Sequence, residues 1–392
     1  MSKIFSHLAL GALLAGVFVA TAAWSQTQGV SKTEVTLGAI LDLSGPLAGP
    51  SKQARNGMQQ RVDEANAKGG IAGRKIKLIA EDNGYDPKKG LLAAQKLAHS
   101  DGVFAVLGHI GTAPNMAALP IQEEQGVINF MPLSGAREMF EPPSKLRYGL
   151  LAPYFDQMRI MVPYMVKQKG FKRVGILYQD DEFGLEFLRG TEAGLKLAKL
   201  PLVEKTSYKR GATDFASQIA KLKAAGCDLV IMGTIIRETV GALAEARKTG
   251  FNAAFMGGVP AYNHLIHVLG EKAVEGFYTA TQGAHPYPDD QSPAVRDWAG
   301  KYKAKYSEDP SVWSVIGYNI VDLFAKAAEK TGANLNADSL AKVMEATVFP
   351  RDIFGSPECK MSKSEHLCSN SFRLAQIENG RWVMLTDYIS GD

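Results

Sequence analysis

The sequence predicts an α/β protein in which two doubly wound lobes follow one another along the chain. Short apolar strands alternate with amphipathic helical segments, and this alternation runs to residue 131 and restarts near residue 157. The strands are continuously apolar, which is typical of parallel sheets covered by helices on both faces. The chain also exceeds a single typical domain of about 100–200 residues.

The first block contains four predicted strands and three predicted helices. The strands are residues 35–41, 75–80, 103–107 and 127–131, and the helices are residues 53–67, 86–98 and 115–125. Asp86 followed by Pro87 is the clearest helix start, because Asp caps a helix and Pro fits its first turn. Gly69 and Gly70 give the first helix a good C-terminal stop.

The second block repeats this order. Its predicted strands are residues 173–178, 228–232, 254–256 and 276–281, and its predicted helices are residues 157–169, 184–197, 214–225 and 238–248, with two more near 293–306 and 313–330. The tail is too short for a third domain, so the two lobes share it and the chain crosses between them more than once. The predicted boundaries are residues 30–151 plus 282–350 for the first lobe, and 152–281 plus 351–392 for the second.

The N-terminal residues predict export. Lys3 precedes an apolar run over residues 8–20, and small residues follow at 21–25. This order is typical of a secretory signal peptide, predicted here as residues 1–25 with cleavage between Ala22 and Gln28. The apolar run is short for a permanent membrane anchor. We therefore expect a periplasmic protein that is free of the membrane.

Two of the three cysteines lie close together in the sequence. Cys359 and Cys368 predict a loop disulfide, which an oxidising compartment favours and which stabilises the fold by roughly 2–3 kcal/mol in the chain-entropy model. The alternative is a metal site with His366 as a third ligand, but no fourth ligand stands at a standard spacing. Cys227 adjoins an apolar strand and is interpreted as a buried thiol.

The ligand site is predicted at the carboxyl ends of the strands, where open parallel sheets bind their ligands. In the first lobe, Thr112 with Ala113 and Ser134 with Gly135 lie in loops that precede helices. Hydroxyl groups beside helix N-termini suit an anion or a carboxylate. The alternative is that Thr112 and Ser134 only cap helices.

Several functions are excluded by missing patterns. The sequence contains no G-x-G-x-x-G, no phosphate-binding G-x-x-x-x-G-K-[ST] and no G-x-S-x-G motif. Lysines and arginines are scattered and the net charge is only +4, so nothing indicates nucleic-acid binding. We expect a binding protein with no catalytic residues, no cofactor and no metal.

A set of short motifs spans nearly the whole chain after the leader. The motifs are Ser44–Ala48, Asn66–Gly73, Asp82 with Asp86-Pro87, Gly108-His109, Asp180 with Phe183-Gly184, and Phe255–Gly257. Together they resemble the type I periplasmic binding proteins of ABC importers, specifically the leucine/isoleucine/valine-binding group. The resemblance implies two Rossmann-like lobes, a three-segment hinge, closure around a ligand and delivery to a membrane permease. A monomer is expected.

The resemblance also assigns site positions. The hydroxyl that meets a ligand carboxylate falls on Thr112, and a second hydroxyl position falls on Ser134 or Gly135. In the second lobe, Phe183 takes an aromatic position and Ile235 a position that is Tyr in the family. The acid that pairs with a ligand ammonium falls near Val259, where no acid stands.

This departure shapes the expected ligand, because burying an unpaired ammonium costs several kcal/mol. The sequence therefore favours an aromatic or aliphatic carboxylate over a standard amino acid. Branched-chain amino acids, or an amide or small-molecule sensor of the same fold, are the alternatives. Three further positions have two interpretations each: Arg137 pairs with the carboxylate or lies on the surface, Tyr154 lines the cleft or packs in the hinge, and Tyr262 stacks on the ligand or packs inward.

Overall fold

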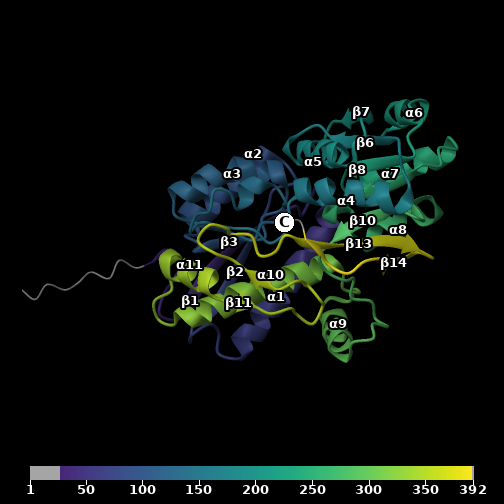
Figure 1. Ribbon diagram of the computed structural model, residues 1–392. Coiled ribbons are helices and arrows are strands. Elements are labelled where there is room, and N and C mark those ends of the chain that lie inside the picture. Colours follow the sequence, from purple (N-terminus) through teal and green to yellow (C-terminus); the bar gives the residue numbers. More distant parts are fainter. Residues whose placement is uncertain (1–26, 391–392) are drawn as a thin grey trace, which may run out of the picture.

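Two sheets form the framework of the computed structural model, which describes residues 27–390 (Figure 1). The first sheet has the order β2-β1-β3-β4-β5 and is parallel throughout. The second has the order β14-β13-β10-β9-β8-β6-β7. In it β13 pairs antiparallel with β10, β14 and β15, and the other pairings are parallel. The predicted fold class is confirmed. The predicted signal peptide lies outside the described residues.

The first lobe covers its sheet with helices on both faces. Its strands are β1 (Glu34–Leu41), β2 (Lys75–Asp82), β3 (Ala105–Leu107), β4 (Ile128–Phe130) and β5 (Arg147–Tyr148). Its helices are α1 (Ala48–Ala67), α2 (Pro87–Gln95), α3 (Thr112–Glu124), α9 (Pro293–Tyr306), α10 (Val312–Thr331) and α11 (Ala337–Ala346). Successive side chains of β1 face opposite sides: Ile40 packs among the side chains of α2 and α3, and Leu41 joins the larger core that includes α1 and α10.

The second lobe has the same layers. Its strands are β6 (Val174–Gln179), β7 (Leu202–Tyr208), β8 (Leu229–Gly233), β9 (Ala254–Gly257), β10 (Tyr278–Thr281), β13 (Ser371–Glu378), β14 (Arg381–Met384) and β15 (Ile389–Ser390). Its helices are α4 (Tyr154–Lys169), α5 (Glu182–Ala198), α6 (Ala216–Ala224), α7 (Ile236–Lys248) and α8 (His264–Gly270). β8 is buried along its whole length, as its apolar sequence predicts.

Three segments connect the lobes. The first crossing (residues 149–153) runs from β5 to α4, the second (282–292) from β10 to α9, and the third (350–370) from β11 (Val348–Phe349) to β13. The third crossing contains β12 (Cys359–Lys360), which pairs with β11, and Leu367 of this crossing bridges to Gly149 of the first. Residues 359–368, which the predicted boundaries assign to the second lobe, thus lie against β11 and the first crossing.

Local signals explain most helix starts. Asp86 accepts hydrogen bonds from the N–H groups of Lys88 and Lys89, and Pro87 opens α2 as predicted. The first helix begins at Ala48, five residues before the predicted start, because Pro50 fits its first turn. No helix among residues 27–390 is long and apolar enough to cross a membrane.

Helices α1 and α10 touch through their backbones. A Cβ atom on Gly57 would lie 1.9 Å from the carbonyl oxygen of Ser314, and one on Gly317 would lie 2.0 Å from that of Ala54. Neither contact is with a flexible side chain, so neither can be relieved without separating the helices. Glycine at these two positions therefore sets the distance between the helices that cover one face of the first sheet.

We predict that Gly317→Ala lowers the free energy of unfolding by about 1–3 kcal/mol, because its new methyl group forces the two helices apart. The matched control is Gly300→Ala on α9, where a Cβ meets nothing within 4 Å. That change stabilises the helix by up to about 1 kcal/mol. Urea unfolding of both variants measures the difference, and equal stability of the two would contradict the account.

Candidate ligand-binding site

Thr112 and Ser134 meet at the carboxyl edge of the first sheet. Thr112 begins α3 and Ser134 follows β4, and their Oγ atoms lie 2.8 Å apart in buried surroundings. Gly111 precedes the helix with a φ of 92°, a conformation that favours glycine. Ala113 lies in the first turn, whose N–H groups have no partner within a helix. Two hydroxyls and a helix N-terminus thus form a neutral cradle for an anion.

Gly135 connects this hydroxyl pair to the first crossing. A Cβ atom on Gly135 would lie 2.8 Å from the carbonyl oxygen of Ala152 and 2.8 Å from the ring of Tyr154. The Tyr154 N–H also donates to the Gly135 carbonyl at 2.9 Å. Burial raises the pKa of Tyr154, and the Ser134 hydroxyl, which hydrogen-bonds to it, opposes this shift only in part. Tyr154 is therefore a neutral side chain that packs between the lobes.

Phe183 and Ile235 lie at the starts of second-lobe helices. Asp181 caps α5 by accepting from the Phe183 N–H, and the Phe183 ring stands edge-on to Tyr154 at 5.3 Å. Ile235 is the residue before α7 and is 2% exposed. The structure thus brings Phe183 against the first crossing, where the ring of Tyr154 lies between Phe183 and Ser134.

Val259 and Tyr262 follow β9. The Val259 N–H donates to Gln157 Oε1 at 3.1 Å, and Gln157 Nε2 donates to the Ala152 carbonyl at 2.7 Å, so Val259 is tied to the first crossing. The Tyr262 hydroxyl accepts from the His285 N–H at 3.1 Å. Its ring is buried, which fits the inward-packing interpretation.

Arg137 is engaged elsewhere. Its guanidinium pairs with Glu141 at 2.8 Å and with Asp156 at 2.7 Å, and it stands over the ring of Phe155. Both carboxylates compete with any anion for its N–H donors. The surface interpretation of Arg137 fits this geometry better than a role in holding a ligand.

Contacts across the cleft come from residues that the sequence analysis did not select. Arg210, in the loop after β7, stands over the Tyr85 ring at 5.2 Å and donates to the Tyr85 carbonyl at 3.3 Å. It also pairs with Asp181 at 2.6 Å. Tyr85 follows β2, so the carboxyl-edge rule could have found it, whereas Arg210 follows a strand that was not predicted. We call these contacts between Arg210 and Tyr85, which join the two lobes, the cleft latch.

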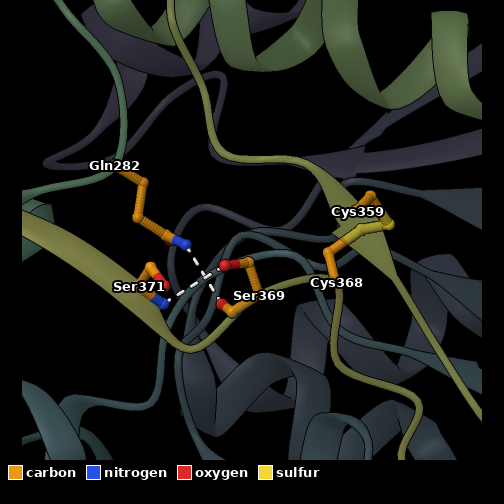
Figure 2. The surroundings of a disulfide bond; sticks show 5 residues. All are labelled: Gln282, Cys359, Cys368, Ser369 and Ser371. Atoms are coloured by element: carbon orange, nitrogen blue, oxygen red, sulfur yellow. Dashed lines mark hydrogen bonds between the residues drawn. A yellow bond between two sulfur atoms is a disulfide. The ribbon is translucent and has the colours of Figure 1, made fainter. Parts of the chain in front are cut away.

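A hinge cavity of about 80 Å³ lies among the three crossings. Val259 and Tyr262 are part of its wall. The lining also includes Leu150, Leu151, Gln282, Gly283, Val312, Trp313, Ile316, Asn319, Asp322, Lys326, Asp352, Ser356 and Ser369. Figure 2 shows Gln282 donating to the Ser369 carbonyl beside the Cys359–Cys368 disulfide. The cavity is thus built from all segments that connect the lobes.

Glu238 is a buried acid that the sequence analysis missed. It lies in the first turn of α7 and is 1% exposed, and neither carboxylate oxygen has a hydrogen-bond partner among the described residues. Burial raises its pKa, and only its own backbone and Arg237 oppose the shift. It is close enough to Tyr208 to raise the pKa of that hydroxyl, after burial itself. The sequence could have indicated this residue, because it lies in the first turn of a helix that follows a strand. Helix side chains lean towards the helix N-terminus, which here lies at the carboxyl edge of the sheet.

The predicted disulfide is confirmed, since Cys359 and Cys368 are bonded. The alternative metal site is therefore wrong. His366 instead stacks on Tyr148 at 5.0 Å, and its Nδ1 lies 2.8 Å from the Ser144 carbonyl oxygen. Within residues 27–390 no group of His, Cys, Asp and Glu side chains is arranged to hold a metal ion.

The periplasmic binding protein family model matches residues 34–381. This chain belongs to the periplasmic binding protein family. The Leu/Ile/Val-binding protein of Escherichia coli (strain K12) is 30% identical over 285 residues, which are 72% of this chain and 76% of that protein. The predicted resemblance to the leucine/isoleucine/valine-binding group is confirmed.

Solved structures share the fold of this periplasmic binding protein. A fatty acid ABC transporter substrate-binding protein from Thermomonospora curvata has a TM-score of 0.84 and 24% identity, over 93% of this chain and 94% of that one. A solute-binding protein from R. palustris in complex with benzoate has a TM-score of 0.81 and 18% identity, over 91% and 98%. At these identities the likeness concerns the fold alone.

We predict that Arg210→Ala opens the ligand-free periplasmic binding protein. The variant loses a cation–π contact and a hydrogen bond across the cleft, which together shift the balance between closed and open forms by about tenfold. Small-angle X-ray scattering would record a larger radius of gyration than for the wild type. Arg296→Ala on α9, whose guanidinium donates only to carbonyls of its own segment, is the control. An unchanged scattering curve for Arg210→Ala would show that the latch does not hold the lobes.

Proposed function

We propose that this periplasmic binding protein is the extracytoplasmic solute-binding component of an ABC importer. Its two lobes close on a small carboxylate-bearing ligand, which it then delivers to a membrane permease. The observation that carries the proposal is the buried hydroxyl pair of Thr112 and Ser134 at the N-terminus of α3. In this role the protein binds its ligand and catalyses no reaction on it.

The hydroxyl pair suits a carboxylate for two reasons. Each hydroxyl can turn its hydrogen towards an anion, and the helix N-terminus adds partial positive charge without a counter-ion that must be displaced. The nearest cationic side chain in the predicted site, Arg137, is already paired with Asp156 and Glu141. The ligand carboxylate is therefore held by neutral donors.

The rest of the site suits an apolar body. Phe183 and Tyr154 pack against each other beside the hydroxyl pair, and the apolar Val259, near which the resemblance places the family's acid, is buried. An aromatic or aliphatic carboxylate is the ligand class that these residues favour. The proteins of similar fold whose names mention a fatty acid and benzoate support this choice.

A branched-chain amino acid is the second candidate, and Glu238 is the observation that favours it. A buried carboxylate without a partner is costly, and a ligand ammonium would give it one. The relative at 30% identity is named for leucine, isoleucine and valine. The acid of this protein would then stand on α7 instead of after β9.

Comparing the binding of leucine with that of 4-methylpentanoate distinguishes the two candidate ligand classes. On the second candidate, Glu238→Gln weakens the binding of leucine about 30-fold or more, because the ammonium loses its charged partner. Glu245→Gln, further along α7 and paired only with Lys248, is the matched control. On the first candidate, 4-methylpentanoate, which is leucine without its ammonium, binds better than leucine and its affinity does not depend on Glu238. Calorimetry with both ligands decides between them.

Export to the periplasm is part of the proposal. The N-terminal sequence supports it, and the disulfide suits an oxidising compartment. A monomer that is not inserted in the membrane fits a carrier that must meet both free ligand and permease.

We predict that Thr112→Ala weakens binding of the true ligand by about 1.5–3 kcal/mol, because a hydrogen bond to a charged group is lost. The ligand itself would come from a thermal-shift screen of amino acids, short amides, aromatic carboxylates and aliphatic carboxylates. Calorimetry then compares the wild type with Thr112→Ala and with Thr249→Ala at the far end of α7. Unchanged affinity in Thr112→Ala would remove this residue from the site.

A further inference from the structure

The hinge cavity and the hydroxyl pair are neighbours through the first crossing. The carbonyl oxygen of Ala152 lies 2.8 Å from where a Cβ on Gly135 would stand, and Gly135 directly follows Ser134. Leu151, the residue before Ala152, lines the hinge cavity. The two features are therefore separated by little more than the thickness of one backbone segment.

Residues of the second lobe also contact the first crossing at Ala152. Gln157 accepts from the Val259 N–H at 3.1 Å and donates to the Ala152 carbonyl at 2.7 Å. It thereby fixes Val259, another residue of the cavity wall, beside the first crossing. Val259 also occupies the family position of the acid that pairs with a ligand ammonium. Val259 thus gives the part of the cavity wall next to the first crossing an apolar, uncharged side chain.

We infer that the hinge cavity receives the aliphatic tail of the ligand whose carboxylate contacts Thr112 and Ser134. The inference rests on the proposed function and specifies its ligand class. The carboxylate stays at the N-terminus of α3, and the hydrocarbon chain passes Leu151 and Val259 into the cavity.

The cavity walls suit a hydrocarbon. Their apolar lining includes Leu150, Leu151 and Val259, and α10 adds Val312, Trp313 and Ile316. Burying apolar surface in such surroundings is favourable in proportion to the area removed from water.

Apart from Trp313, the polar and charged side chains of the walls have partners within the protein, including Asp322 and Lys326, which pair with each other at 2.6 Å. Gln282 Oε1 accepts from the Ala152 N–H at 2.7 Å, and its Nε2 donates to the Ser369 carbonyl. Asn319 donates to Asp352 and, at 3.3 Å, to Ser356. A charged ligand group would have to break these bonds, so the cavity selects against an ammonium or a second carboxylate.

One polar atom of the cavity wall, the indole nitrogen of Trp313, has no hydrogen-bond partner among the described residues. Trp313 is 4% exposed and lines the cavity. An occupant that carries one hydrogen-bond acceptor along its chain, such as a keto or ether oxygen, would satisfy it.

The size of the cavity favours a chain over a ring. Its volume is about 80 Å³. An engineered apolar cavity of about 150 Å³ in another protein binds benzene. The smaller space admits an alkyl chain of a few carbons without movement of its walls.

The test is a homologous series of straight-chain carboxylates, from acetate to decanoate, titrated by calorimetry into the wild type. Affinity is expected to rise about fourfold for each added methylene until the cavity is full, because each buried methylene contributes about 0.8 kcal/mol. Benzoate is the aromatic comparison and is expected to bind more weakly than the best alkyl chain. Affinity that does not depend on chain length would overturn the inference.

A cavity-filling variant tests the location of the tail. Gly283 lines the cavity, and a Cβ there would meet only the Ser356 Oγ at 3.6 Å, so Gly283→Leu places a side chain in the free space. We expect it to flatten the dependence of affinity on chain length. Gly300→Leu on α9, where a Cβ meets nothing within 4 Å, is the matched control and keeps the wild-type dependence. A wild-type dependence in Gly283→Leu would exclude the cavity as the tail site.

The outcomes for the two proposals differ. If carboxylates bind but chain length has no effect, the tail site is wrong and the carboxylate cradle stands. If no carboxylate of any length binds while neutral amides or other solutes do, the cradle itself is wrong and the tail site falls with it.

Discussion

The packing of the first crossing against Gly135 is the contact on which the site depends. Because there is no room for a Cβ between Gly135 and the Ala152 carbonyl, the crossing lies directly on the loop that carries Ser134. The Tyr154 N–H completes this contact by donating to the Gly135 carbonyl. Tyr154, which follows the crossing, also makes the aromatic contact with Phe183. The Ala152 carbonyl of the crossing accepts a hydrogen bond from Gln157, which in turn accepts one from the Val259 N–H. In the proposed site, a hinge segment is thus also a wall, so the proposal links closure of the lobes to ligand contact.

This arrangement separates two kinds of chemistry within a short distance. The hydroxyl pair and the N-terminus of α3 offer donors without a formal charge. The hinge cavity offers apolar walls in which Gln282 is hydrogen-bonded within the protein and the Trp313 Nε1–H is not. Glu238 stands apart from both, as a buried carboxylate beside Tyr208. Its burial without a partner is the observation that favours a branched-chain amino acid, the second candidate ligand.

Much of the fold could be predicted because apolar periodicity and helix caps are local signals. Asp86-Pro87 begins a helix as expected, and the carboxyl-edge rule brought Thr112 and Ser134 to one place although 22 residues separate them. Strand β7 was missed because it is an edge strand that pairs only with β6 and is only partly buried, so its sequence mixes apolar and charged residues. The hairpin of β13 and β14 was missed although Asn379-Gly380, both with positive φ, is a strong turn signal.

The rest of the site depends on contacts between distant residues. The pairing of Arg137 with Asp156 and the stacking of Arg210 on Tyr85 follow from how the lobes meet, which no local pattern encodes. The surroundings of Glu238 likewise include Tyr208 at the end of β7, which lies 30 residues earlier in the chain. Charged residues in a sequence cannot be sorted into surface, structural and ligand-facing groups until their partners are known.

The most direct test of the account is a crystal structure of the protein with the carboxylate that binds it best. The account predicts both carboxylate oxygens within hydrogen-bond distance of Thr112 Oγ1, Ser134 Oγ or the first N–H groups of α3, with the rest of the ligand directed past Val259 towards the hinge. A ligand whose carboxylate lies elsewhere, with the Thr112–Ser134 hydrogen bond intact and unoccupied, would contradict it.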